Sequence, residues 1–427
     1  MRRTLVLAVV IGILLASTAF VDAQERVKLR FWNGWGGARI PLMEKMIADF
    51  EALYPWIEVE NEVISLGNER IERLILAVAS GSVPDVVMID RADIPMFVRK
   101  GILHPLDEYI EKDGLDTSIF YEPEIASSRY AGSTYVLPIP TAGAKQLLFV
   151  NNDIFAESGL SEQDIPRTWA ELEEVSRKVT RREADGSLEI LAFDPLFVPD
   201  AGWDFWLFSN GGTIVSEDLR TVKLVTPEAI STLEWIRSFV DVINGGIEAM
   251  QAHAAKYTSG FADGRVAMSL RGSWDWYILR QTVPDINMAL AMPPAGPNGK
   301  SINLVDKGWG YGIPKGAPHP YESWLLIKYM TTAEEAACWF MREQARPSPV
   351  IACNQDPELV ESNPYMHVIG EALMAGYQIP ITPIHSQLFA EIRTVTSPVM
   401  RGQSILGALQ ETERRAQAML DEAWAEE

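Results

Sequence analysis

Binding chemistry is best placed between residues 261 and 276, where a polar loop leads into an apolar run and then into Gly272-Ser273-Trp274-Asp275. The run 266–270 predicts a buried strand, and Ser273 can cap a helix that starts behind it. A strand that turns into a helix through Gly-Ser puts the next side chains at the carboxyl edge of a sheet, where open α/β sheets bind their ligands. There the flat indole of Trp274 can cover the apolar face of a sugar ring, and packing between helix and sheet is the alternative.

The elements that would position such a site alternate near the start of the chain. Their order is strand, helix, strand, helix, strand over residues 27–32, 40–54, 57–64, 70–80 and 84–89. Pro55 and Gly81 end the two helices. Strands that alternate with helices over some sixty residues predict a parallel, doubly wound sheet.

Length and charge restrict the class of protein. The chain has 427 residues, 47% hydrophobic and 22% charged, which suits a globular protein of two or three lobes. Its 37 Lys and Arg against 58 Asp and Glu give a net charge of −21, which argues against nucleic acid and anionic membrane surfaces as partners.

The first residues have the features of a secretory signal. Met1-Arg2-Arg3-Thr4 precedes the apolar run 5–16, and Val21-Asp22-Ala23 offers small residues for cleavage, so we expect a signal peptide over 1–23. Because no cysteine lies near that cut, we expect an exported protein that is not lipid-anchored.

Cysteines and histidines leave little scope for metal chemistry. Cys338 and Cys353 are the only cysteines; after export they could form a disulfide, and two small buried hydrophobic side chains are the alternative. The five histidines are scattered and have no spacing typical of metal ligands. We therefore expect neither a metal nor a cofactor.

Short stretches across nearly the whole chain resemble extracellular solute-binding protein family 1, the sugar-binding subunits of ABC importers. The stretches, in the order that the family has them, include Phe31-Trp32 with its glycine turn, Ser80-Gly81…Pro84-Asp85-Val86, Pro105-Leu106-Asp107, Thr168-Trp169…Glu171-Leu172, Gly264-Arg265-Val266-Ala267-Met268, Gly272-Ser273-Trp274 and Trp309-Gly310…Ile313-Pro314. The resemblance implies a periplasmic binding protein-like α/β fold, with two doubly wound lobes, crossing hinge segments and a ligand cleft between the lobes. We expect lobe 1 over 24–140 and 307–345, and lobe 2 over 141–306 and 346–427.

The resemblance also implies ligand contacts, mostly aromatic or polar residues at strand ends and crossings. They are Asn33 and Trp35 in the glycine turn, Asp90 and Asp93 after the third strand, Thr141 where the chain leaves lobe 1, Trp203 and Trp206, Trp274 and Asp275, Gly308 and Trp309 where the chain returns, Arg346 at the last crossing, and Phe389 with Arg393.

Several of these residues have a structural alternative. Trp35 could be a loop lid packed on its lobe, and Asp90 and Asp93 could be a helix cap and a surface charge. One of Trp203 and Trp206 is expected in the core. Most arginines in so acidic a chain pair with carboxylates.

The function that follows from the resemblance is capture of a sugar or oligosaccharide for a membrane permease, by a monomeric periplasmic protein without catalytic activity. A secreted glycosidase is one alternative, but the chain has no Gly-x-Ser-x-Gly, no His-Glu-x-x-His and no phosphate-cradling loop. A binder of glycerol 3-phosphate or a related acidic ligand is the other. It would need basic or N–H-rich groups, which Arg346 and the segment 308–310 could supply.

Overall fold

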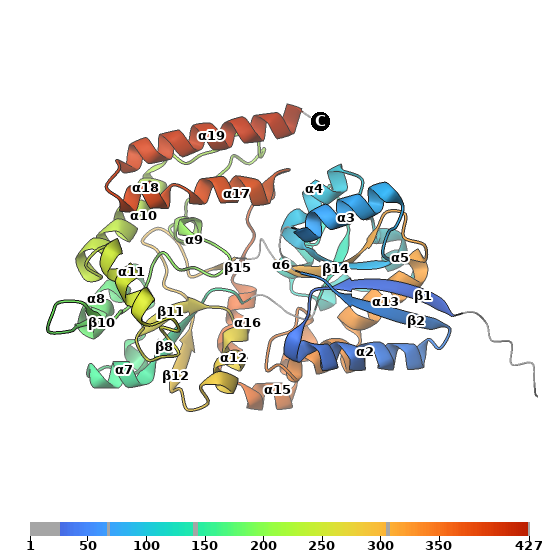
Figure 1. Cartoon of the computed structure of the whole chain (residues 1–427), viewed down its shortest axis with the longest axis horizontal. Coiled ribbons are helices and arrows are strands. Elements are labelled where there is room, and N and C mark those ends of the chain that lie inside the picture. The colour runs from blue at the N-terminus through green and yellow to red at the C-terminus, as the bar shows by residue number, and fades with distance from the viewer. Residues whose placement is uncertain (1–25, 66–68, 140–143, 305–307, 426–427) are drawn as a thin grey trace, which may run out of the picture.

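The computed structural model describes residues 26–65, 69–139, 144–304 and 308–425, and Figure 1 shows them as two α/β lobes side by side. The predicted signal peptide and Thr141 lie outside the described residues. None of the described helices is long and apolar enough to cross a membrane.

Lobe 1 is built on a mixed sheet (Figure 1, blue strands with orange β14). Its central strands lie in the order β2 (Ile57–Val63), β1 (Val27–Asn33), β3 (Val86–Asp90), β14 (Trp309–Pro314) and β4 (Leu103–His104), and β7 (Val136–Pro138) also pairs with β14. The ladders of β1 with β2 and β3 are parallel, as the alternating pattern predicts. β14 is antiparallel to β3, β4 and β7.

Helices cover both faces of this sheet because its strands are apolar on both sides. Phe31 and Met88 point into a core shared with α2 (Ile40–Leu53) and α13 (Pro320–Thr332), while Trp32 and Val87 point into a core shared with α3 (Glu69–Ser80) and α4 (Ile94–Arg99). The smaller helices of the lobe are α5 (Asp107–Lys112), α6 (Glu122–Ala126) and α14 (Trp339–Arg342), with the one-turn segments η1 (Gly37–Arg39) and η2 (Arg91–Asp93).

Lobe 2 has a small central sheet whose ladders are antiparallel. β8 (Leu147–Asn151) lies between β11 (Met268–Arg271) and β12 (Met288–Ala291) and runs against both. Both faces are again covered: Leu148 and Val150 belong to one core, and Leu147 and Phe149 to another. The two-lobe α/β class is thus confirmed. The central sheet of lobe 2 differs from the parallel sheet expected of a doubly wound lobe, because its ladders are antiparallel.

Helices make up most of lobe 2. They are α7 (Asn152–Glu157), α8 (Trp169–Val179), α9 (Trp203–Ser209), α10 (Pro227–Ser238), α11 (Ile247–Lys256), α12 (Trp274–Thr282), α15 (Pro357–Ser362), α16 (Met366–Met374), α17 (His385–Arg393), α18 (Thr396–Met400) and α19 (Ile405–Ala425). The last three lie along the top of lobe 2 in the view of Figure 1 (red). α19 reaches lobe 1, where Arg99 donates to the carbonyl of Ala423 at 2.6 Å.

Core membership bears on where the last crossing between the lobes lies. Val350 forms a β-bridge with Phe120, and Val350 and Cys353 belong to a core of lobe 1. Leu359 belongs to a core of lobe 2. We therefore propose a lobe boundary near Asp356 instead of at residue 346.

Candidate ligand-binding site

The two central sheets present matching edges. β3 ends at Asp90, which is paired with Trp309, the first residue of β14. β11 ends at Arg271, which is paired with Leu147, the first residue of β8. In each lobe, therefore, strands that end at this edge lie beside a strand that begins there, and the loops at the edge carry most of the predicted site residues.

Trp35, Arg39 and Trp309 form the part contributed by lobe 1. The side-chain oxygen of the buried Asn33 accepts the backbone N–H of Trp35 at 3.1 Å and so fixes the turn after β1. The rings of Trp35 and Trp309 meet edge to face, with centroids 6.4 Å apart. A guanidinium lies over each ring: that of Arg39 is 4.5 Å from the Trp35 centroid, and that of Arg70 is 5.1 Å from the Trp309 centroid. Trp35 is buried and Trp309 is partly exposed, so Trp309 is the more open of the two indoles.

The two predicted carboxylates after β3 have different roles. Asp90 is half-buried and accepts the backbone N–H of Ala92 at 3.1 Å, which is the capping alternative. Asp93 is buried in an ion pair with Arg70 and accepts the Ser386 hydroxyl of α17 at 3.2 Å. Asp93 is therefore no solvated surface charge; it fastens the two lobes to one another.

Trp274 lies at the facing edge of lobe 2 as the first residue of α12. Its indole folds back over Gly272: a Cβ there would lie only 2.2 Å from Cη2 of the ring. Ser273 does not cap the helix as predicted, because its backbone is already helical (φ −54°, ψ −24°) and its side chain makes no capping bond. The glycine, rather than the serine, sets the position of Trp274.

Asp275 lies beside Trp274 and is paired with Arg271 at 2.7 Å. Burial raises the pKa of Asp275, while the positive charges of Arg271 and Arg346 act to lower it. The carboxylate is thus already neutralised by a neighbour in its own lobe.

Arg346 lies between these two groups. The charge of Arg39 from lobe 1 and the charge of Asp275 from lobe 2 both act on its guanidinium, and the centroid of the Trp274 ring is 5.8 Å from Cζ. We call Trp35, Arg39, Trp309, Trp274, Asp275 and Arg346 the interlobe cluster. It brings together five residues predicted from sequence and one, Arg39, that was not.

Arg346 is 4% exposed, and among the described residues its Nε and Nη1 have no hydrogen-bond partner. Burial, reinforced by the charge of Arg39, lowers the pKa of Arg346 to about 9, against the opposing effect of Asp275. The side chain remains charged at neutral pH, and a buried cation without a partner is unfavourable by several kcal/mol.

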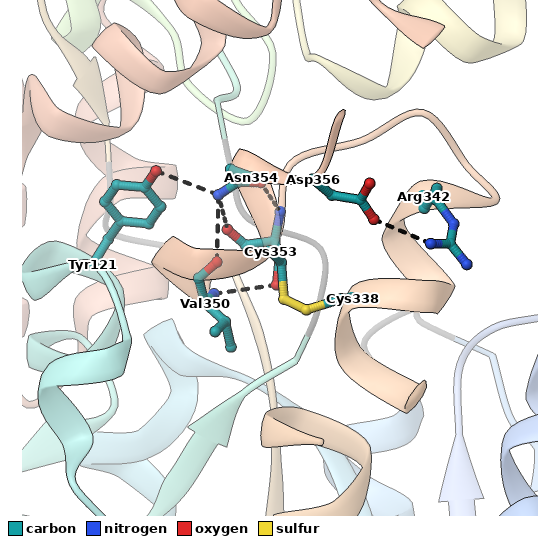
Figure 2. The surroundings of a disulfide bond; sticks show 8 residues. Tyr121, Cys338, Arg342, Val350, Cys353, Asn354 and Asp356 are labelled. Atoms are coloured by element: carbon teal, nitrogen blue, oxygen red, sulfur yellow. Dashed lines mark hydrogen bonds and ion pairs between the residues drawn. A yellow bond between two sulfur atoms is a disulfide. The ribbon is translucent and has the colours of Figure 1, made fainter. Parts of the chain in front are cut away.

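A disulfide closes the loop that carries Arg346 (Figure 2). Cys338 and Cys353 are bonded, which decides between the two alternatives left by the sequence. Asn354 ties the same loop down, since its side chain accepts the N–H of Ser348 at 2.8 Å and donates to its carbonyl at 2.9 Å. The loop also supplies Gln344, whose Oε1 accepts from Nε of Arg39 at 2.9 Å.

Trp203 and Trp206 are not part of this cluster. Both are buried in the core of lobe 2, where their indole N–H groups donate to the carbonyls of Ile392 and Pro195. Trp206 packs among other aromatic rings, including that of Trp169. The expected split of one core and one cleft tryptophan was wrong, since α9 is buried throughout.

The predicted pair Phe389 and Arg393 also packs in lobe 2, away from the interlobe cluster. Phe389 is 2% exposed and packs on Phe208 and His385. Arg393 makes two hydrogen bonds, 2.8 and 2.7 Å long, to the fully buried carboxylate of Asp204. Because a buried carboxylate needs a counter-charge, the ion pair with Asp204 holds the Arg393 face of α17 against α9 in the core of lobe 2.

Gly308 has a local reason to be glycine. Its φ is +152°, and a Cβ would lie 2.0 Å from a guanidinium nitrogen of Arg91, whose backbone N–H donates to the Gly308 carbonyl. The packing of Arg91 therefore accounts for Gly308 without a ligand. In the described ranges no group of three or more His, Cys, Asp or Glu side chains could hold a metal ion.

Comparisons with known proteins agree with this architecture. Residues 37–337 match the family model for bacterial extracellular solute-binding proteins. A maltotriose-binding protein of Pyrococcus abyssi is 22% identical over 385 residues, covering 88% of this chain and 78% of that protein. A binding protein of Brucella abortus (strain 2308) is 25% identical over 289 residues, 67% of each chain.

Solved structures show the same fold. CpMnBP1 with mannotriose bound superposes with a TM-score of 0.79 at 22% identity, covering 92% of this chain and all of that chain. The sugar-binding protein MalE from Xanthomonas citri gives a TM-score of 0.77 at 22% identity, covering 93% and 98%. With the family model matched over more than half of its length, the chain belongs to the bacterial extracellular solute-binding protein family.

Proposed function

We propose that this protein is the substrate-binding subunit of an ABC importer, which captures a sugar or oligosaccharide between its lobes and delivers it to a membrane permease. The observation that carries the proposal is the interlobe cluster, where indoles and charged groups of both lobes converge on Arg346. Aromatic faces and a few fixed polar groups are what sugar recognition requires.

The energetics of such a site are adequate. A half-covered sugar ring buries roughly 50–100 Å² of apolar surface on each indole, worth about 1–2.5 kcal/mol. Trp274 and Trp309 are partly exposed and can each offer a face. Two such contacts and a few hydrogen bonds reach the about −8 kcal/mol of a micromolar complex after the costs of ordering.

The ligand names of the relatives support a sugar in particular, since they include maltotriose and mannotriose. We further propose that the protein acts in the periplasm as a monomer without catalytic turnover. Contacts such as Ser386 with Asp93 and Arg99 with Ala423 would form and break as the lobes close on ligand and open.

A thermal-shift screen of the purified protein against mono- and oligosaccharides tests the proposal. A sugar at a hundred times its dissociation constant stabilises the protein by about 2.7 kcal/mol, which is an easily visible shift. Prolonged incubation with the bound sugar, followed by chromatography, should return it unchanged. Consumption of the sugar would refute a pure binding function.

Trp274→Ala tests the proposed contact within that function. Because the indole is half-buried at the edge of lobe 2, we expect at least about tenfold weaker sugar binding from the lost stacking area, with folding retained. Isothermal titration measures the affinity and circular dichroism the fold. An unchanged affinity would assign Trp274 to packing alone.

A further inference from the structure

We infer that the sugar bound by this protein carries an anionic group, a carboxylate or a phosphate, which Arg346 binds in the interlobe cluster. The inference rests on the proposed function, because it assumes a sugar between the lobes. It adds the charge of the ligand and the residue that selects for that charge.

The Arg346 guanidinium is buried and lacks an ion pair among the described residues. Nothing among the described residues accepts a hydrogen bond from Nε or Nη1, and the residue is buried. Arg91 also has an unpartnered Nε, but its guanidinium pairs with the Glu124 carboxylate, and the half-buried Arg393 pairs with Asp204. Among the described residues Arg346 is therefore a buried cation without an ion pair, and a bound ligand can supply the acceptor for its Nε and Nη1.

Positive charge predominates around Arg346 among the described residues. Arg39, Arg271 and Arg346 face one carboxylate, Asp275, which is already paired with Arg271. Arg39 is hydrogen-bonded to the neutral amide of Gln344. In the part of the chain that the structure describes, these three guanidinium groups thus share one neighbouring carboxylate, although the whole chain has a net charge of −21.

Hydroxyl groups alone would not resolve this imbalance. A neutral sugar could accept hydrogen bonds from Nε and Nη1 but would add no negative charge beside the buried Arg346 guanidinium. A carboxylate or a phosphate satisfies the fork of N–H groups and the charge together, in the paired geometry that arginine favours. Closure of the lobes over such a ligand converts an unfavourable burial into a favourable one.

The position of Arg346 also sets the position of the anionic group on the sugar. Cζ lies 5.8 Å from the centroid of Trp274, so a ring stacked on that indole can direct a substituent at its edge toward the guanidinium. Trp274 would bind the apolar face of the sugar, and Arg346 the charged substituent.

The test is isothermal titration of matched ligands. Glucose and galactose are compared with glucuronate and galacturonate, which have a carboxylate at C6, and with glucose 6-phosphate and glycerol 3-phosphate. We expect at least one anionic sugar to bind about 100-fold more tightly than its neutral counterpart. Carboxylate binding without phosphate binding identifies a sugar acid, and the reverse identifies a sugar phosphate.

The opposite outcomes separate the inference from the function. Neutral sugars that bind as tightly as their anionic counterparts overturn the inference and leave sugar capture intact. Binding of glycerol 3-phosphate with no sugar overturns the sugar proposal and keeps the role of Arg346. A panel in which nothing binds refutes both.

Arg346→Gln assigns the selectivity to this side chain. We expect about 100-fold weaker binding of the anionic sugar, an intermediate loss for Arg346→Lys, and a melting temperature without ligand that is not lowered. Arg414→Gln, on the exposed face of α19, is the matched control and should bind like the parent protein. Equal affinity of Arg346→Gln and the parent for the anionic sugar would overturn the inference.

Discussion

Gly272 can be tested as the residue that positions Trp274. In Gly272→Ala the new methyl group would lie 2.2 to 2.3 Å from Cη2, Cζ2 and Cζ3 of the indole, whereas carbon atoms normally approach to about 3.5–4.0 Å. The indole must therefore retreat by more than about 1 Å. Since it belongs to a half-buried side chain at the edge of the lobe, it can move without unfolding the core.

The expected loss follows from the stacking area. If the displaced indole no longer covers a sugar ring, about 1–2.5 kcal/mol is lost, which raises the dissociation constant about 5- to 70-fold. We expect the free energy of unfolding to change by less than about 1 kcal/mol, because no buried group loses its partner.

Gly370→Ala is the matched control, since this glycine lies in α16 with nothing within 4 Å of the added methyl group. It should raise stability by about 0.5–1 kcal/mol and leave binding unchanged. Isothermal titration with the sugar found by screening and urea denaturation give the two quantities. An unaltered dissociation constant in Gly272→Ala would refute the placement of Trp274 against the ligand.

Three further predictions concern the groups around the site and the core. Asp204→Ala leaves Arg393 without its counter-charge and should destabilise the protein by about 3 kcal/mol in urea denaturation. A decrease in the free energy of unfolding below about 1 kcal/mol would show that the ion pair contributes little. Replacing Cys338 and Cys353 by serine should lower the free energy of unfolding by about 3 kcal/mol, as for a loop of this length, and should weaken ligand binding because the loop carries Arg346. Unchanged binding in this variant would show that the site does not depend on the disulfide. Only the charged form of Arg346 binds an anion, and its pKa is about 9. Affinity for an anionic sugar should therefore be constant from about pH 6 to 8 and fall about tenfold per pH unit well above 9. An affinity that does not change over this whole range would contradict the prediction.

Much of lobe 1 could be predicted from local pattern. Period-two and helical spacing predicted β1, α2, β2 and α3 to within a residue or two, because these elements are amphipathic or apolar in a way that their own sequence records. The parallel ladders of β1 follow from the same alternation. The antiparallel ladders of β8 and β14 could not be predicted in this way, because they depend on where the chain enters each lobe after a crossing.

The site was harder to predict because partners far away in sequence decide whether a side chain points into the core or toward the site. Nothing near Trp206 shows that it packs against Trp169, and nothing near Arg393 shows that Asp204 will bind it. Arg39 was missed because Trp35 lies in the turn before η1, so no helical spacing in the sequence links the two side chains.

The structure of the protein with its bound sugar tests the central claim most directly. We predict one sugar ring against the indole of Trp274, polar contacts from both lobes, and an anionic substituent within hydrogen-bonding distance of the Arg346 guanidinium. A sugar bound to one lobe alone would contradict the account. So would a sugar in the surface hollow of 570 Å³ lined by Ile165, Met292 and Tyr365.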